Sequence, residues 1–125
     1  MGLVPKRIRI RGDRGAAVVQ ALFDTGASKS LIRRDVAVKV ARPLRARTPW
    51  TFLLGDGRGK LKTNEMVGLL FELKGVSILH QFIVARHLSE EVIIGTDLMQ
   101  FWKIRPAPVR EDVLIDKKLI QLKLV

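Results

Sequence analysis

The stretch Leu22-Phe23-Asp24-Thr25-Gly26-Ala27-Ser28 decides the fold that the sequence predicts. An apolar segment ends here, and an acid, a hydroxyl, a glycine and small residues follow. We expect the carboxylate of Asp24 to stand at the tip of a rigid strand, because Gly26 lets the backbone turn tightly and lets another group approach closely. The Thr25 hydroxyl can lock the loop, and nearby backbone N–H groups can orient the carboxylate. The pattern favours a catalytic acid over the alternative, an ordinary polar turn after a strand.

The residues before this stretch predict a hairpin. Ile8–Arg11 and Ala17–Phe23 have the composition of strands, and Gly12-Asp13-Arg14-Gly15 between them has the composition of a turn. The alternation of Arg7-Ile8-Arg9-Ile10-Arg11 indicates a strand with one face in water. Ala17–Phe23 is nearly continuous in apolar character, so we expect it to be buried on both faces.

The residues after this stretch predict two more hairpins. Asp35–Val40 is consistent with either a short helix or a strand. Trp50–Leu54 then runs into Gly55-Asp56-Gly57, and a strand that enters Asp-Gly indicates a tight hairpin because the turn needs positive φ. The second hairpin consists of Met66–Leu73 and Val76–Ala85, joined through Lys74-Gly75.

The C-terminal part predicts a buried strand, a helix and two further strands. Glu91–Gly95 is a short apolar segment that ends at glycine, and Thr96 or Asp97 can cap a helix that continues through Trp102. Asp112–Ile115 and Leu119–Leu124 are strand-like. An apolar strand at a chain end is an unpaired edge unless something covers it.

Length and composition exclude several classes of protein. The 125 residues correspond to about one domain, so we expect a single domain over 1–125. There is no cysteine, which excludes disulfides and thiolate sites, and the only histidines are His80 and His87. We therefore expect no metal site and no cofactor. The apolar runs are too short to span a membrane and the N-terminus lacks a secretory signal, so we expect a soluble, cytoplasmic protein.

Three segments together resemble the retropepsin-like aspartic proteases, a family of single-domain enzymes of retroviral, retrotransposon and related cellular origin. Asp24–Ile32 resembles the active-site loop of this family and its exit. Leu54-Gly55-Asp56-Gly57 resembles the glycine-containing flap. Val92-Ile93-Ile94-Gly95-Thr96-Asp97-Leu98-Met99 resembles the second signature, in which aliphatic residues and a glycine open a helix. The segments occur in the family's order and span the chain from Ala17 onward.

The resemblance implies an all-β fold: a closed, barrel-like retropepsin (acid protease) fold with a flap hairpin and one short C-terminal helix. It implies an aspartic endopeptidase in which Asp24, Thr25 and Gly26 are catalytic. The residues that it implies for substrate binding are Leu22, Ala27, Ser28, Lys29, Leu31, Leu54, Gly55, Asp56, Gly57, Val92 and Ile93. The viral enzymes commonly carry acidic residues where this chain has Ser28 and Lys29, so their substrate preference is not carried over.

The implied mechanism needs two carboxylates, and this chain has one Asp-Thr-Gly. The resemblance places Asp97 in the scaffold at a helix start, where a carboxylate favours the positive end of the dipole. We therefore expect a homodimer in which Asp24 of each subunit meets at a two-fold axis. Thr25 would hydrogen-bond across that axis, and the Leu53–Arg58 hairpin would cover a peptide or protein substrate. Leu119–Leu124 would pair with the partner chain, or else within its own subunit.

Two alternatives remain open at this point. One is a non-catalytic module on the same fold that serves dimerisation or binding. The other is a basic nucleic-acid-binding β-domain, for which the net charge of +11 is the only support. We expect no nucleic-acid partner, because the positive charges are spread along the chain and no aromatic platform accompanies them.

Overall fold

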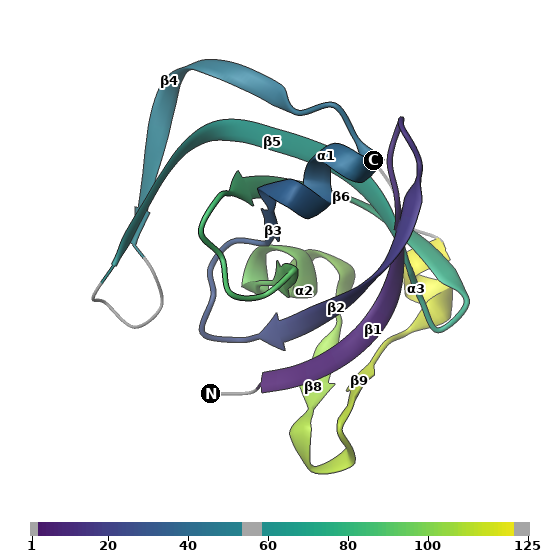
Figure 1. Cartoon of the computed structure of the whole chain (residues 1–125). Helices are drawn as coiled ribbons and strands as arrows, with labels where there is room; N and C mark the ends of the chain where they lie inside the picture. The colour runs from purple at the N-terminus through teal and green to yellow at the C-terminus, as the bar shows by residue number, and fades with distance from the viewer. Residues whose placement is uncertain (1–2, 54–58, 122–125) are drawn as a thin grey trace.

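The first two strands form the hairpin that the sequence predicts. In the computed structural model, which describes residues 3–53 and 59–121, β1 (Leu3–Arg11) pairs antiparallel with β2 (Ala16–Asp24) (Figure 1). On β1 the side chains of Ile8 and Ile10 are buried and those of Arg7, Arg9 and Arg11 are exposed, as the alternation indicates. The prediction that Ala17–Phe23 is buried on both faces is wrong, because Val18 is 53% exposed. β2 forms part of a barrel wall, which has an inside and an outside.

The strands close into the predicted barrel. The remaining strands of the large sheet are β3 (Leu31–Arg33), β4 (Leu44–Leu53), β5 (Lys60–Leu73), β6 (Val76–Ala85) and β7 (Val92–Ile94). Their order is β1-β2-β7-β3-β6-β5-β4, and a further pairing of β1 with β5 closes the ring and leaves β4 outside it. The interior is filled by aliphatic side chains and by Phe23, Phe71 and Phe82. Closure reduces the unpaired edges that an open sheet of this composition would expose, while β4 keeps an outer edge.

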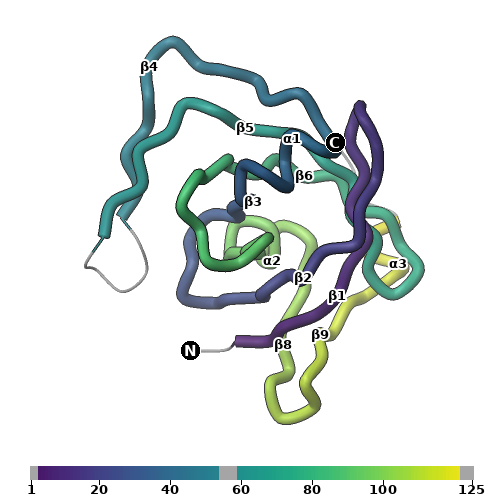
Figure 2. Tube along the Cα trace, viewed as in Figure 1, coloured from purple at the N-terminus to yellow at the C-terminus, as the bar shows by residue number. Residues whose placement is uncertain are grey.

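The strands of both later hairpins pair as predicted. β5 and β6 pair from Leu73 and Val76 outward, and Lys74 and Gly75 between them have φ of 50° and 84°. Positive φ at both central residues is characteristic of the tight two-residue turn whose twist matches that of the flanking strands. β4 and β5 also pair antiparallel, up to Leu53 opposite Lys60. Their arms extend beyond the barrel on the side of the loop between β2 and β3 (Figure 2). The predicted flap residues Leu54, Gly55, Asp56 and Gly57 lie outside the described residues.

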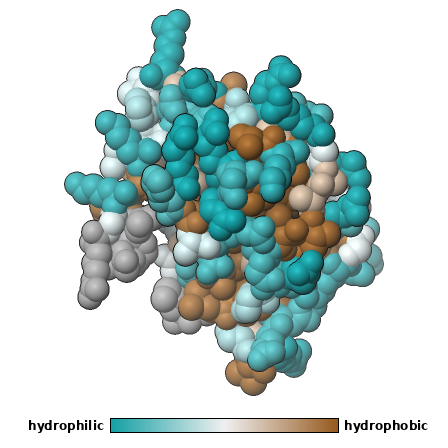
Figure 3. Space-filling model, in the orientation of Figure 1, coloured by the Kyte–Doolittle hydropathy of each residue, from teal (hydrophilic) through white to brown (hydrophobic). Residues whose placement is uncertain are grey.

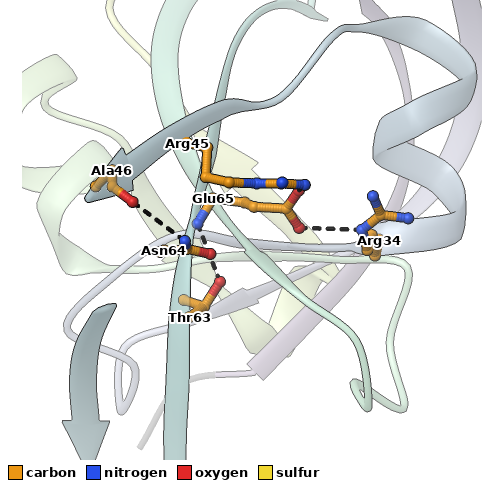
Figure 4. Close-up of polar contacts among 6 residues, drawn as sticks. All are labelled: Arg34, Arg45, Ala46, Thr63, Asn64 and Glu65. Carbon is orange, nitrogen blue, oxygen red and sulfur yellow. Dashed lines mark hydrogen bonds and ion pairs between the residues drawn. The ribbon is translucent and has the colours of Figure 1, made fainter. Parts of the chain in front are cut away.

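The segment left open between helix and strand is a helix, α1 (Arg34–Val40). Val36, Ala37 and Val40 are buried on one face, while Asp35 in the first turn and Lys39 in the last turn suit the helix dipole. An ion-pair cluster ties α1 to the β4–β5 hairpin (Figure 4). The buried carboxylate of Glu65 accepts hydrogen bonds from Arg34 Nε at 3.0 Å and from an Arg45 terminal nitrogen at 3.2 Å.

The β4–β5 ladder is irregular beside this cluster. The register shifts between Arg45 and Trp50, so part of β4 lacks regular partners on β5. The side-chain amide of Asn64 donates to the carbonyl of Ala46 at 3.1 Å and replaces one of the missing ladder bonds (Figure 4). A register shift bends the strand that carries it. The hairpin arms therefore bend where Glu65 anchors them.

The C-terminal part contains the predicted helix, α2 (Thr96–Trp102), followed by a small extension. The elements of the extension are β8 (Arg105–Ala107), the 3-10 turn η1 (Pro108–Arg110), β9 (Asp112–Leu114) and α3 (Lys117–Gln121). The residue that precedes α2 is Gly95, so neither Thr96 nor Asp97 caps it as predicted. β9 confirms the strand predicted at Asp112–Ile115.

The prediction of a strand over Leu119–Leu124 is wrong for the residues that the structure describes. Leu119 to Gln121 lie in α3, and residues 122–125 are outside the described part. The Asp116 side chain accepts a hydrogen bond from Leu119 N at 3.1 Å, and the Asp116 carbonyl accepts one from Ile120 N at 3.1 Å. An Asp that caps the first turn favours helix over strand. Ile120 is buried in its own subunit rather than offered as an open edge.

Asp112 fastens the extension to the barrel. Its carboxylate oxygens accept hydrogen bonds from Lys6 Nζ at 2.9 Å and from Lys74 Nζ at 2.8 Å. These bonds, with that from Lys74 foremost, hold the pKa of Asp112 well below its usual range. Lys6 belongs to β1 and Lys74 to the β5–β6 turn. One carboxylate therefore links β9 to two separate parts of the barrel.

The surface is dominated by charged and polar side chains. Hydrophilic residues cover most of the face shown in Figure 3, and hydrophobic ones form patches between them. Among residues 3–53 and 59–121, no helix is long and apolar enough to cross a membrane.

Candidate active site

Asp24 ends β2 and begins the loop on which the sequence analysis centres. Leu3 pairs with Asp24 on one side, and Ile94 of β7 pairs with Phe23 on the other. Asp24 therefore pairs with β1 and directly follows the last residue of β2 that pairs with β7. Its Oδ1 accepts a hydrogen bond from Gly26 N at 2.8 Å, and its carbonyl accepts one from Ala27 N at 3.1 Å. The loop thus orients one carboxylate oxygen and leaves the half-buried acid accessible.

A close backbone contact fixes the far side of the loop. A Cβ on Gly95 would lie 2.6 Å from the carbonyl oxygen of Lys29 and 2.8 Å from that of Ala27. Only glycine fits where two backbones approach this closely. Thr96 N donates to the Ala27 carbonyl at 2.8 Å, and Gly95 N donates to Ser30 Oγ at 3.0 Å. The start of α2 therefore clamps the active-site loop, which explains why the two sequence signatures occur together.

The loop ends in a buried polar network that the sequence analysis did not identify. Ser30 is fully buried, and its Oγ donates to Asp97 Oδ1 at 2.8 Å while its N–H donates to Oδ2 at 3.1 Å. Leu98 N also donates to Oδ1 at 2.8 Å, and His80 Nε2 lies 3.4 Å from Oδ2. The predicted scaffold role of Asp97 at the helix start is consistent with these contacts. Its partners Ser30 and His80 are distant in sequence and carry no local signal.

The electrostatics of this network follow from its contacts. Burial raises the pKa of Asp97, but hydrogen bonds from His80, from the Ser30 side chain and from backbone N–H groups outweigh that effect. The pKa of Asp97 is therefore lower than its ordinary value, and the group is a carboxylate at neutral pH. A carboxylate can accept from every one of these donors at once, which a protonated acid cannot.

The predicted substrate residues that the structure describes are exposed, partly exposed or buried. Ser28 and Lys29 are exposed on the loop, and Leu22, Ala27 and Ile93 are partly exposed. Leu31 is only 7% exposed and lines a cavity beside β5. Val92 is fully buried, so its predicted place in a substrate pocket does not agree with the structure. On β7 successive side chains point to opposite faces, and Val92 points into the barrel core.

Thr25 is exposed and lies at the border of a second cavity. This cavity has a volume of about 930 Å³ and lies between α2 and the C-terminal extension, with Met99, Ile104 and Leu119 among its lining. Thr25 therefore does not point into the core of its own subunit. In the part of the chain that the structure covers, no three His, Asp or Glu side chains are grouped as ligands for a metal ion.

The barrel, the acid at the end of β2 and the clamp from α2 define a retropepsin-like fold. A search of solved structures returned 65 matching chains, and two of them illustrate the likeness. The retroviral protease-like domain of Ddi1 from Leishmania major aligns with a TM-score of 0.64 and 18% identity, over 94% of this chain and 90% of that one. The EIAV protease, in complex with the inhibitor HBY-793, aligns with a TM-score of 0.57 and 20% identity, over 77% of this chain and 84% of that one.

At these levels of identity the likeness shows the fold. No protein-family model and no curated protein sequence matches the chain.

Proposed function

We propose that this chain is one subunit of a homodimeric aspartic endopeptidase. The observation that carries the proposal is the orientation of Asp24, whose Oδ1 accepts the Gly26 N–H at 2.8 Å at the end of a barrel strand. A carboxylate held in this way can act as a general base toward a water molecule or as a general acid toward a carbonyl oxygen. The fold shared with a retroviral protease adds support, since that neighbour is named as a protease.

Peptide hydrolysis needs a second carboxylate beside the first. Four other acids are paired within the subunit: Asp97 with Ser30 and His80, Asp35 with Arg33, Glu65 with Arg34, and Asp112 with Lys6 and Lys74. We infer that the second acid is Asp24 of another copy of the chain. In such a pair one acid accepts a proton from water while the other donates one to the carbonyl oxygen.

The other predicted roles follow from this arrangement. The exposed Thr25 would meet its counterpart across the two-fold axis. The backbone of Gly26, Ser28 and Lys29 would pair with an extended peptide by strand addition. The β4–β5 hairpin would cover the peptide and exclude water. A β-barrel that served only for binding would not need a carboxylate oriented at an accessible loop.

The test compares wild type with Asp24→Asn on a mixed peptide library, from about pH 3 to about pH 7. Loss of the acid should lower cleavage by at least about 10²–10⁴-fold while the fold is kept. Asp13→Asn is a matched control, because Asp13 is an exposed acid whose Oδ1 accepts one backbone N–H, from Arg42 at 2.9 Å. Cleavage by Asp24→Asn at the wild-type rate would refute the proposal. No cleavage by any folded, dimeric variant would favour the binding module.

A further inference from the structure

A groove beside the candidate active site carries an excess of positive charge. It has a volume of about 530 Å³ and lies between the start of β5 and the turn that follows β6. Its lining consists of Leu31, Arg45, Lys60, Leu61, Lys62, Thr63, Asn64, Glu65, Ala85, Arg86, His87 and Leu88. The side chains of Lys60, Lys62, Arg86 and His87 are exposed.

The positive charge of the groove is not neutralised from within. Glu65 is the only acid in the lining, and its carboxylate is already engaged by Arg34 and Arg45. Among residues 3–53 and 59–121, no ion pair involves Lys60, Lys62 or Arg86. Unpaired cations that converge on one groove create a positive potential, which attracts a ligand of opposite charge.

The groove adjoins the strand that leaves the active-site loop. Leu31 lines it and directly follows Ser30, the residue that ends the loop. Leu31 also pairs with Ile93 of β7 and with Ile83 of β6, and Ala85 at the other side of the groove pairs with Arg33. A peptide that passed the Asp24 loop under the β4–β5 hairpin would therefore bring neighbouring side chains to these cations.

The lining favours a peptide over a nucleic acid. It contains no Phe, Trp or Tyr, and the single ring of His87 is too little to stack successive bases of a strand. It does contain Leu31, Leu61 and Leu88, which can contact the aliphatic part of a side chain. Glutamate combines an aliphatic stem with a carboxylate, and both parts match this lining.

We propose that this groove binds acidic side chains of the substrate and makes the protein selective for acidic peptides. The inference rests on the proposed function, because the peptide that it orients is the one presented to Asp24. Lys60, Lys62 and Arg86 are then specificity-determining residues. An exposed charge pair contributes only a few-fold at most, so three together should give a preference of about tenfold at low salt. The preference should shrink as ionic strength rises.

The experiment uses peptide pairs that differ only in Glu or Gln near the site of cleavage. The ratio of kcat/KM for the Glu peptide over the Gln peptide is measured for wild type and for the triple variant Lys60→Gln, Lys62→Gln, Arg86→Gln. A matched control, Arg7→Gln, Arg9→Gln, Arg11→Gln, removes the same charge from exposed positions on the outer face of β1. The ratio should fall about tenfold in the groove variant and stay near the wild-type value in the β1 variant.

A binding arm separates this inference from the proposed catalysis. Fluorescence anisotropy of the labelled peptides is measured with Asp24→Asn protein, with and without the groove substitutions. If no variant cleaves but the Glu peptide still binds more tightly and loses that advantage in the groove variant, the inference stands and the catalytic proposal fails. An unchanged Glu-to-Gln ratio in the groove variant would overturn the inference. So would displacement of the Glu peptide by a short RNA that binds the groove more tightly.

Discussion

At the scale of single residues, Gly95 and Asp97 determine where the active-site loop lies. Gly95 allows α2 to approach the backbone of Ala27 and Lys29, and Asp97 accepts the buried donors of Ser30. Both residues belong to the sequence motif around α2 rather than to the motif around Asp24. The geometry of the acid therefore depends on a segment about seventy positions away along the chain.

Gly95→Ala should destabilise the protein and reduce cleavage together. The added Cβ would meet backbone atoms at 2.6 to 2.8 Å, and backbone cannot move aside as a flexible side chain can. Overpacking of this kind costs about 1–3 kcal/mol of unfolding free energy. The measurement is urea denaturation, with Gly68→Ala as control because a Cβ there meets nothing within 4 Å. Equal stability of the two variants would show that the clamp is not tight.

Asp97 should make stability depend on pH. Its pKa in the folded state is lowered, so the unfolded chain binds a proton more readily and stability rises with pH. The contribution is present above the unfolded pKa of about 4 and is lost as pH falls through the lower folded value. Asp97→Asn should therefore be less stable than wild type at neutral pH, and the difference should narrow in acid. The measurement is the unfolding free energy of both proteins at several pH values. A difference between wild type and Asp97→Asn that stayed constant with pH would contradict the prediction.

At the scale of elements, the β4–β5 hairpin is anchored at its base by Glu65. This carboxylate on β5 joins Arg34 on α1 to Arg45 on β4, next to the register shift that bends the hairpin (Figure 4). The hydrogen bond from Arg34 is the main reason why the pKa of Glu65 lies below its ordinary value, with Arg45 adding to it. The anchor holds the arms in place while the hairpin beyond it extends past the barrel.

Glu65→Gln should loosen this anchor. Removal of a buried carboxylate leaves two arginines without their partner, and hydrogen bonds to charged groups are worth about 1.5–3 kcal/mol. Because both guanidinium groups are partly open to solvent, we expect a loss of about 1–2 kcal/mol of unfolding free energy. Glu72→Gln, an exposed acid on the same strand, should change stability by less than about 0.5 kcal/mol. A loss no larger than that of the control would show that the cluster contributes little.

At the scale of the whole molecule, the proposed active site exists only in a pair of chains. Activity should therefore depend on protein concentration, because dissociation removes the site. Among the described residues a single chain already has a closed barrel and a buried core, so we expect the subunit to fold without its partner and the site to form on pairing.

Mixing the subunits tests whether each contributes one acid. A tenfold excess of Asp24→Asn chains should place almost every wild-type chain in a mixed pair. If mixed pairs lack the dyad, cleavage per wild-type chain should fall by about tenfold once the subunits have exchanged. Addition of the same excess of the control variant Asp13→Asn, which keeps Asp24, should not lower cleavage per wild-type chain. Full activity of wild-type chains in mixed pairs would mean that one Asp24 is sufficient.

The sequence by itself determined the features that depend on local chemistry. The β1–β2 and β5–β6 hairpins follow from turn residues, and α2 follows from the glycine and apolar pattern before it. The short-range pattern around Asp24 likewise predicts a loop at a strand end, which is where Asp24 lies.

Only the tertiary structure decided the features that depend on distant partners. Barrel closure places Val18 outside and Val92 inside, although both are apolar, and the Asp116 cap turns Leu119–Gln121 into a helix although its residues suit a strand. Ser30, His80 and Asp97 meet although they lie far apart in sequence, and Arg86 likewise joins Lys60 and Lys62 at the groove. The physical reason is that burial and charge are set by which segments pack together, whereas turns and strand periods are set by the residues themselves.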